Sequence, residues 1–207
     1  NKLTANIREL NKLAGKITSN RAKAIPVLEK RIRENLTLLG MPNANLKIEL
    51  IQLEDFTEKG KDQAKFLFSA NKKVELQEIS KVASGGELSR LMLTIKALIA
   101  EHAAVPTIIF DEIDTGVSGD IADKMGYIMQ QMAKHMQIIS ITHLPQIASK
   151  GHSHAVVYKQ ETATGTETHL KILDTENRVQ EIAKMLSGKE LTPAAIENAK
   201  ELLNASD

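Results

Sequence analysis

The sequence has 207 residues, of which 42% are hydrophobic, and its 27 basic side chains nearly balance 26 acidic ones. Such a composition is typical of one or two compact domains, and the net charge of +1 by itself indicates no charged partner. The absence of cysteine excludes disulfides and thiolate metal sites and fits a reducing cytoplasm. No apolar run approaches the roughly 20 residues that a membrane-spanning helix needs.

The charge is unevenly distributed. Residues 1–40 carry nine Lys or Arg against three Glu, a local charge of +6, which leaves −5 for the remainder. Such a run usually marks a solvated helix face, but it could also follow a nucleic-acid backbone. The first residues show no signal-peptide character and no initiating methionine, and a helical pattern begins at once. We therefore expect the chain to be a piece of a longer protein.

Residues 2–39 have a helical pattern. Apolar positions spaced by four and three form a coiled-coil seam: Leu3, Ile7, Leu10, Ala14 and Ile17. Pro26 predicts a kink or a restart, and the Gly40–Pro42 stretch ends the helix. Two interpretations stay open. The helix is an ordinary amphipathic helix packed on its own domain or the returning helix of an antiparallel coiled-coil arm, and each interpretation could hold for a different half.

The next segments indicate antiparallel strands. Residues 45–53 alternate in polarity, residues 54–63 resemble a charged turn, and residues 64–70 predict a second strand. A short edge element is expected within 74–79. A helix then opens at 84–87, where Ser84 and Glu87 have the spacing of a capping box.

The following part predicts a parallel α/β core. Residues 107–110 and 137–141 are continuous apolar runs, as strands buried on both faces require. A helix separates them, so the order strand, helix, strand favours a parallel pair. Two further strands, at 154–160 and 168–173, surround a turn, and two amphipathic helices end the chain.

The clearest candidate for chemistry is the pair Asp111-Glu112, which follows the first apolar strand. Ligands bind outside the carboxyl ends of strands in open α/β sheets. Asp111 suits a Mg²⁺ site and Glu112 suits a general base that activates water. Alone the pair is a weak signal, because many strands end in solvated carboxylates.

Three further motifs accompany it. Ser84-Gly85-Gly86 places backbone N–H groups at a helix start, which is an anion site or simply a cap. The loop 114–119 is either part of the site or a plain connection. His143, after the second apolar strand, could contact a phosphate or be an ordinary loop histidine. The pair His152 and His154 could bind metal, although two solvated histidines are the favoured interpretation.

Taken together and in this order, the four motifs resemble the C-terminal lobe of an ABC-type ATPase head, with its signature motif, Walker B motif, D-loop and switch histidine. The stretches VASGGELSR (82–90), FDEIDTGVSG (110–119) and ITHLPQIA (141–148) are similar to the RecN family of bacterial DNA repair proteins, relatives of the SMC proteins. The resemblance covers essentially the whole chain. It implies an α/β lobe at 41–207, with parallel strands, flanking helices and antiparallel strands, preceded by a helical arm at 1–40 that ends a coiled coil.

The resemblance also implies roles. It assigns the signature motif, which contacts ATP held by the other subunit, to Ser84, Gly85, Gly86 and Glu87. It assigns Mg²⁺ support to Asp111, the catalytic base to Glu112, the γ-phosphate contact to His143 and a contact across the dimer interface to Asp114. The implied partners are the N-terminal lobe of the same protein, a second head in a head-to-head homodimer, and double-stranded DNA or its ends. The implied setting is double-strand break repair and recombination at the nucleoid in the bacterial cytoplasm, with no membrane.

One part of such an ATPase is missing. The sequence contains no G-x-x-x-x-G-K-[ST] phosphate loop, because Gly15-Lys16-Ile17-Thr18 lacks the upstream glycine and lies in a predicted helix. The loop is expected in the N-terminal lobe, so we expect no ATP hydrolysis by this chain alone. A non-catalytic dimerisation or DNA-binding scaffold stays an open alternative. The nucleotide-binding domain of a membrane transporter is disfavoured by the coiled-coil lead-in and by SGGELSR, which lacks the usual glutamine.

Overall fold

The computed structural model describes residues 2–72, 74–81, 85–100, 105–162, 165–188 and 190–204. The chain divides into two compact units, Asn1–Ile95 and Lys96–Asp207. This division cuts through a helix and does not coincide with the boundary expected at residue 40. The separation into an arm and a lobe therefore stays a prediction.

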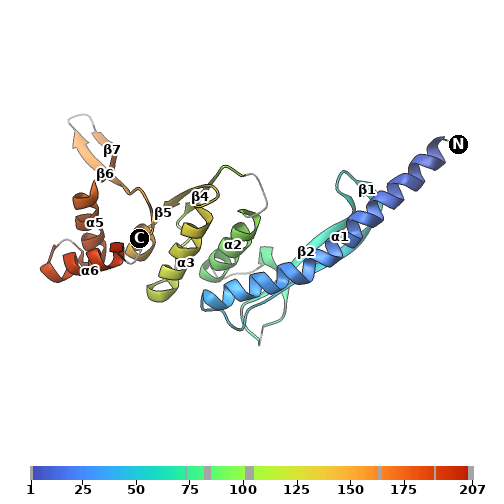
Figure 1. Cartoon of the computed structure of the whole chain (residues 1–207), viewed down its shortest axis with the longest axis horizontal. Helices are drawn as coiled ribbons and strands as arrows, with labels where there is room; N and C mark the ends of the chain where they lie inside the picture. The colour runs from blue at the N-terminus through green and yellow to red at the C-terminus, as the bar shows by residue number, and fades with distance from the viewer. Residues whose placement is uncertain are drawn as a thin grey trace. The chain divides into compact units, whose positions relative to one another are not determined.

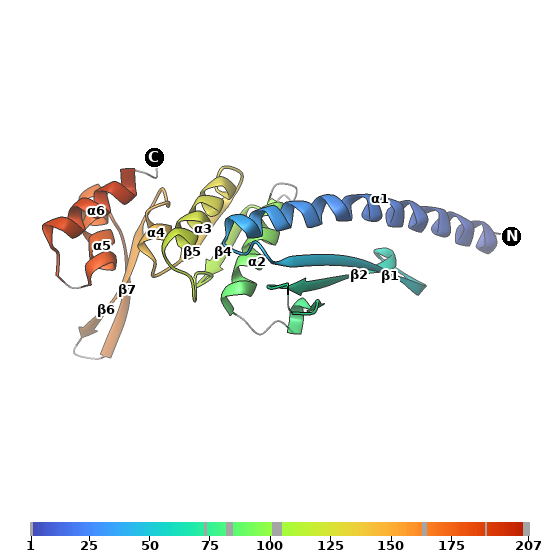
Figure 2. The ribbon, with the colours of Figure 1, turned by 90° about the horizontal axis from the view of Figure 1, so that it is seen from below.

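The first unit contains a long helix and a β-hairpin. Helix α1 (Lys2–Leu38) lies alongside strands β1 (Asn45–Thr57) and β2 (Gly60–Ser69), as both ribbon views show (Figures 1 and 2). A short strand β3 (Gln77–Glu78) pairs with β2, a 3-10 turn follows at Ile79–Lys81, and helix α2 (Gly85–Ala100) begins in this unit. The predicted antiparallel pairing of the two long strands is confirmed.

Helix α1 is continuous through Pro26, so the restart that the sequence suggested is wrong. Pro26 removes only the N–H that would donate to the carbonyl of Ala22. Both residues are exposed, so water can hydrate that carbonyl. The helix therefore loses one hydrogen bond without leaving a buried polar group unpaired.

The hairpin is longer than its sequence indicated. The register runs from Asn45 opposite Ser69 to Gln52 opposite Asp62, and after an irregular stretch Thr57 pairs with Gly60. The charged turn expected at 54–63 is therefore wrong, and most of that segment is strand. Its polar residues lie on both faces, which removed the apolar alternation by which a strand is recognised. Gly60, with a φ of 104°, completes the tight turn.

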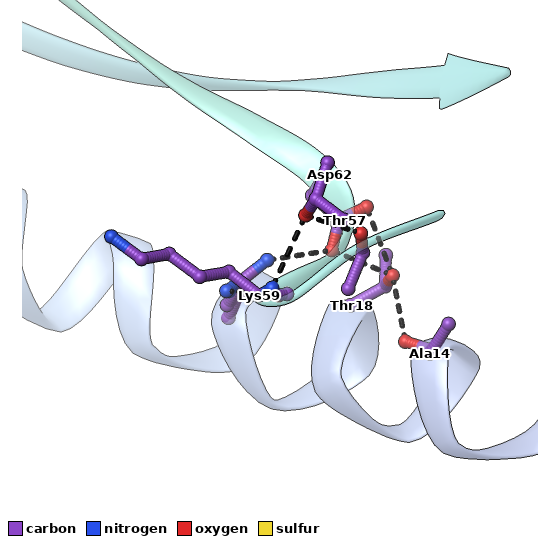
Figure 3. Close-up of polar contacts among 7 residues, drawn as sticks. Ala14, Thr18, Thr57, Lys59 and Asp62 are labelled. Atoms are coloured by element: carbon purple, nitrogen blue, oxygen red, sulfur yellow. Dashed lines mark hydrogen bonds and ion pairs between the residues drawn. The ribbon is translucent and has the colours of Figure 1, made fainter. Parts of the chain in front are cut away.

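A buried carboxylate holds the hairpin against α1. The two carboxylate oxygens of Asp62 lie 2.9 and 2.7 Å from the Thr18 hydroxyl, and Arg21 Nη1 approaches one of them at 3.3 Å. Arg21 Nη2 also donates to the Lys59 carbonyl at 2.8 Å. The Asp62 side chain is only 2% exposed. Figure 3 shows Asp62 reaching from the hairpin toward Thr18 on the helix. We call Asp62, Thr18 and Arg21 the Asp62 clamp.

The described part of the second unit contains two pairs of strands, and helices follow or connect them. In chain order its elements are β4 (Thr107–Asp111), α3 (Gly119–Met132), β5 (Gln137–Ile141), α4 (Pro145–Ala148), β6 (Ala155–Thr162), β7 (Gly165–Ile172), α5 (Thr175–Ser187) and α6 (Pro193–Asn204). Strands β4 and β5 are parallel and β6 and β7 antiparallel, as predicted. Helices α5 and α6 pack through the buried residues Ile182, Ala183, Ala195 and Ala199.

Helix α3 approaches α4 closely at Gly126. A Cβ atom at this position would lie 2.9 Å from Lys150 Cγ and 3.2 Å from the Gln146 carbonyl oxygen. Lys150 in turn pairs with Asp123 at 3.0 Å. The glycine thus permits the contact that fixes the segment after β5 against α3.

The expectation that β4 and β5 are buried on both faces is wrong for one face. Phe110 is 2% exposed, but Ile109, Ile139 and Ile141 are 60%, 43% and 53% exposed. The register pairs Ile109 with Ile139 and Asp111 with Ile141, so these side chains share one side of the sheet. No described element of this unit buries that side. We call Ile109, Ile139 and Ile141 the open face.

Candidate active site

The predicted carboxylates and the predicted histidine lie at one edge of the β4–β5 sheet. Asp111 is the last residue of β4, and the N–H of Glu112 donates to the Ile141 carbonyl at 3.1 Å. Thr142 and His143 directly follow Ile141. Since parallel strands end at the same edge, the structure brings these residues together as the sequence suggested.

Glu112 has an unusual backbone. Its φ of 47° makes it the one non-glycine residue with positive φ in the described ranges. The Glu112 carbonyl accepts hydrogen bonds from the Thr115 N–H at 3.2 Å and the Thr115 hydroxyl at 2.9 Å. Left-handed backbone at such a residue costs free energy and persists only where the surroundings fix it. The turn therefore places the exposed Glu112 side chain at a defined position beside the strand ends.

Asp114 has a role inside the unit that the sequence did not reveal. Its carboxylate is 1% exposed, accepts a hydrogen bond from the Thr142 hydroxyl and lies 3.8 Å from His143 Nδ1. The second oxygen, Oδ1, is buried and has no hydrogen-bond partner within the described residues. The same Thr142 hydroxyl accepts from the Leu144 N–H at 3.0 Å. The loop after β4 is thus tied to the segment after β5.

Thr142 was missed because a threonine at the end of a strand is common. The available signal was its position next to His143, at the same edge as the loop that carries Asp114. The expected contact of Asp114 across a dimer interface stays a prediction.

The remaining groups at this edge are open to solvent. Asp111 and Glu112 are exposed, and the His143 side chain is 67% exposed. The Asp111 carboxylate makes no hydrogen bond or ion pair with any described residue, so its oxygens are available to a hard cation. The described residues contain no cluster of three or more His, Asp or Glu that could hold a metal. A single exposed carboxylate can hold Mg²⁺ only together with ligands from elsewhere, such as phosphates and water.

The signature residues belong to the first unit. Ser84 lies outside the described residues, and so does the predicted capping box. Gly85, Gly86 and Glu87 form the first turn of α2, and the space around Gly85 is open. Arg90 binds this turn to the end of the first helix, because its Nε donates to the Gly86 carbonyl at 3.0 Å and its Nη1 to the Leu39 carbonyl at 2.9 Å.

The histidine pair lies elsewhere in the second unit. His152 and His154 line a cleft of about 1110 Å³ between α3, α5 and α6, and none of the predicted site residues lines it. Burial, together with the nearby Arg178 guanidinium, lowers the pKa of His154. Arg178 donates to the carbonyls of Ser149 and Gly151, which fixes the base of this cleft.

Comparison with known proteins gives one consistent result. The chain is 40% identical over 194 residues to DNA repair protein RecN of Vibrio cholerae, which covers 93% of this chain and 35% of that protein. It is 41% identical over 192 residues to RecN of Rickettsia prowazekii and 35% identical over 192 residues to RecN of Halalkalibacterium halodurans. The chain is a relative of DNA repair protein RecN. It spans about a third of the length of these relatives, and no protein-family model matches it.

Solved structures agree on the fold. The Smc head domain with a coiled coil and joint from Pyrococcus yayanosii matches 88% of this chain with a TM-score of 0.65 at 17% identity, over 34% of its own length. The Smc head domain from Pyrococcus furiosus matches 88% of this chain and 44% of its own length, with a TM-score of 0.61 at 15% identity. The α/β fold predicted from the sequence, of the kind found in these Smc head domains, is therefore confirmed. In the described ranges no helix is both long and apolar enough to cross a membrane.

Proposed function

We propose that this chain is the C-terminal lobe of a RecN-like head and supplies part of a site that hydrolyses ATP. The proposal rests on one observation: Asp111, Glu112 and His143 lie at the same edge of the β4–β5 sheet. The backbone of Glu112 is held there in a left-handed conformation. The similarity to RecN, a DNA repair protein, supports a role in bacterial DNA repair. We extend the proposal to recombination and to a location at the nucleoid in the cytoplasm.

Each residue has a distinct task in this proposal. Glu112 accepts a proton from the attacking water and orients it. His143 donates a hydrogen bond to the γ-phosphate, and Asp114, 3.8 Å from the imidazole, orients the ring. Asp111 would hold a Mg²⁺ ion, which would offset the charge of the phosphates.

The site is incomplete in this chain. An N-terminal lobe of the same protein would supply the phosphate loop and would bury the open face, whose three isoleucines are each at least 43% exposed. Gly85 and Gly86 would present backbone N–H groups to ATP held by a second head in a head-to-head homodimer. The open space around Gly85 leaves room for such a ligand.

Mixing the two lobes tests this proposal. We expect no Mg²⁺-dependent ATP turnover by the chain alone, and turnover after it is mixed with a lobe that carries a phosphate loop. Turnover by the chain alone would show that the nucleotide site is misplaced. Association of the lobes without turnover would favour the non-catalytic scaffold.

The substitution Glu112→Gln tests the proposed base. In the complete protein we expect turnover to fall by about 100-fold or more, because the amide cannot accept the proton, while ATP-dependent dimerisation persists. The matched control is Glu201→Gln on an exposed part of α6, which should leave turnover unchanged. Equal turnover in both variants would refute the assignment of the base.

A further inference from the structure

A row of basic side chains follows one side of α1. Each residue of an α-helix is rotated by about 100° about the helix axis from the one before it. On this basis five basic side chains project within a sector about 80° wide: Arg8, Lys12, Lys16, Lys23 and Lys30. From the first to the last the row is about 33 Å long, at 1.5 Å per residue. All five residues are exposed. We call these five residues the basic row.

The Asp62 clamp determines where this row faces. The helix residues that meet the hairpin are on roughly the opposite side: Ala14, Thr18, Arg21 and Glu29. Ala14 is 6% exposed, and Glu29 accepts a hydrogen bond from the Ile48 N–H at 2.8 Å. Since the hairpin occupies this side (Figure 3), the basic row points away from it into solvent.

A coiled-coil partner would not cover the row either. The exposed apolar side chains of the N-terminal half of α1 are Leu3, Ile7, Leu10, Leu13 and Ile17. Their mean direction lies about 155° from that of the basic row. A second helix packed on this seam therefore leaves the basic row open.

The positive charge of the row is largely uncompensated. Within the described residues only Lys30 has an acidic partner, Glu34 at 3.9 Å, and both side chains are well exposed. Arg8, Lys12, Lys16 and Lys23 form no ion pair there. Glu9 lies at the edge of the sector and is the other acidic neighbour. The row thus presents a nearly continuous line of cations.

We propose that the basic row binds the phosphate backbone of double-stranded DNA, an inference that builds on the proposed repair function. Its length of about 33 Å matches one turn of the duplex, about 34 Å, and a duplex carries one charge per roughly 1.7 Å of axis. Two small residues stand between the cations, Ser19 inside the sector and Gly15 at its edge, and they let a backbone approach.

The composition disfavours other anionic partners. Residues 1–40 contain no Phe, Tyr or Trp, so they offer no platform on which the bases of a single strand could stack. The apolar residues of the sector are Ala5 and Pro26, with Val27 at its edge, and none of them is a Trp, Phe or Leu that could anchor the helix in a lipid surface. Binding through phosphates alone is independent of base sequence and strongly dependent on salt.

The test is a salt titration of duplex binding by the full-length protein. The variant replaces Lys12, Lys16 and Lys23 by Gln, which keeps a good helix former at each exposed position. Fluorescence anisotropy of a labelled duplex of about three helical turns is measured between about 50 and 200 mM NaCl. We expect at least a tenfold loss of affinity, and a slope of log K against log salt that is shallower by about 3.

The matched control replaces Lys47, Lys65 and Lys72 by Gln, with the same change in net charge at exposed or partly exposed positions of the same unit. We expect its affinity to change by less than about threefold. Equal losses in the two variants, or an unchanged slope in the first, would overturn the proposal. Basal ATP turnover without DNA is measured in both variants. If DNA binding depends on the basic row but ATP is not turned over, only the ATPase proposal is refuted. If ATP is turned over but DNA binding does not depend on the basic row, only this inference is refuted.

Discussion

At the residue scale, the sequence predicted that two carboxylates and a histidine lie at one sheet edge, but not which contacts hold that edge together. Asp111, Glu112 and His143 are recognisable because each follows an apolar strand, and parallel pairing brings strand ends together. The hydrogen bond between Asp114 and Thr142 depends on the β4–β5 register and on the path of two loops. The strand register and the loop paths cannot be predicted from residue types, so the sequence did not reveal this buried hydrogen bond between two motifs.

Replacing Thr142 by Val should destabilise the second unit. Valine keeps the shape of threonine but removes the hydroxyl that donates to the buried Asp114 carboxylate, and an unsatisfied buried carboxylate costs about 2 kcal/mol. Urea unfolding of the variant measures this loss. Thr142→Ser keeps the hydroxyl and should lose less than half as much. Equal loss in the two variants would show that the methyl group, not the hydrogen bond, matters.

At the element scale, the helices were predicted more faithfully than the hairpin. The apolar seam of α1 and the stripes of α5 and α6 have a strong helical period. The strands β1 and β2 continue through residues 54–57 and 60–63, where polar side chains on both faces leave no alternation to detect. The packing of this hairpin against α1 was also unforeseen, because Asp62 resembled one more charged residue in a turn.

Replacing Asp62 by Ala should loosen the hairpin from α1. The change removes a 2% exposed carboxylate that the Thr18 hydroxyl and Arg21 both approach within 3.3 Å. We expect a loss of about 2 kcal/mol in unfolding free energy and faster amide exchange along β2. Asp55→Ala, at an exposed position of β1, is the control and should cost less than about 0.5 kcal/mol. Equal effects would mean that the clamp contributes no stability.

At the scale of the whole molecule, the open face is the feature that differs most from the prediction. The continuous apolar runs of β4 and β5 predicted burial on two sides, and the structure supplies it on one. A continuous apolar run predicts burial but does not say which element provides it, and this chain spans about a third of the length of its RecN relatives. The missing cover and the missing phosphate loop both fit the proposal of an absent N-terminal lobe.

Replacing Ile139 by Ser should weaken association with that lobe. Burial of an isoleucine contributes about 1.5–3 kcal/mol, so we expect the dissociation constant to rise at least about tenfold. Calorimetric titration of the chain with the separate lobe measures the change. The stability of the chain alone should hardly change, because Ile139 is 43% exposed. Val27→Ser, on a residue of α1 that is 57% exposed, is the control, and equal weakening by both substitutions would contradict the proposed docking face.

The Asp62 clamp also has a mechanical consequence. Helix α1 has 37 residues, and the clamp grips it at Thr18 and Arg21, close to its midpoint. Contacts along one side of a helix, here the clamp together with the hydrogen bond from the Ile48 N–H to Glu29, resist rotation of the helix about its own axis. Torque applied to the N-terminal half of the helix is therefore transmitted to the hairpin instead of being released by rotation. The helix acts as a shaft coupled to β1 and β2, over a lever of about 24 Å between Lys2 and Thr18.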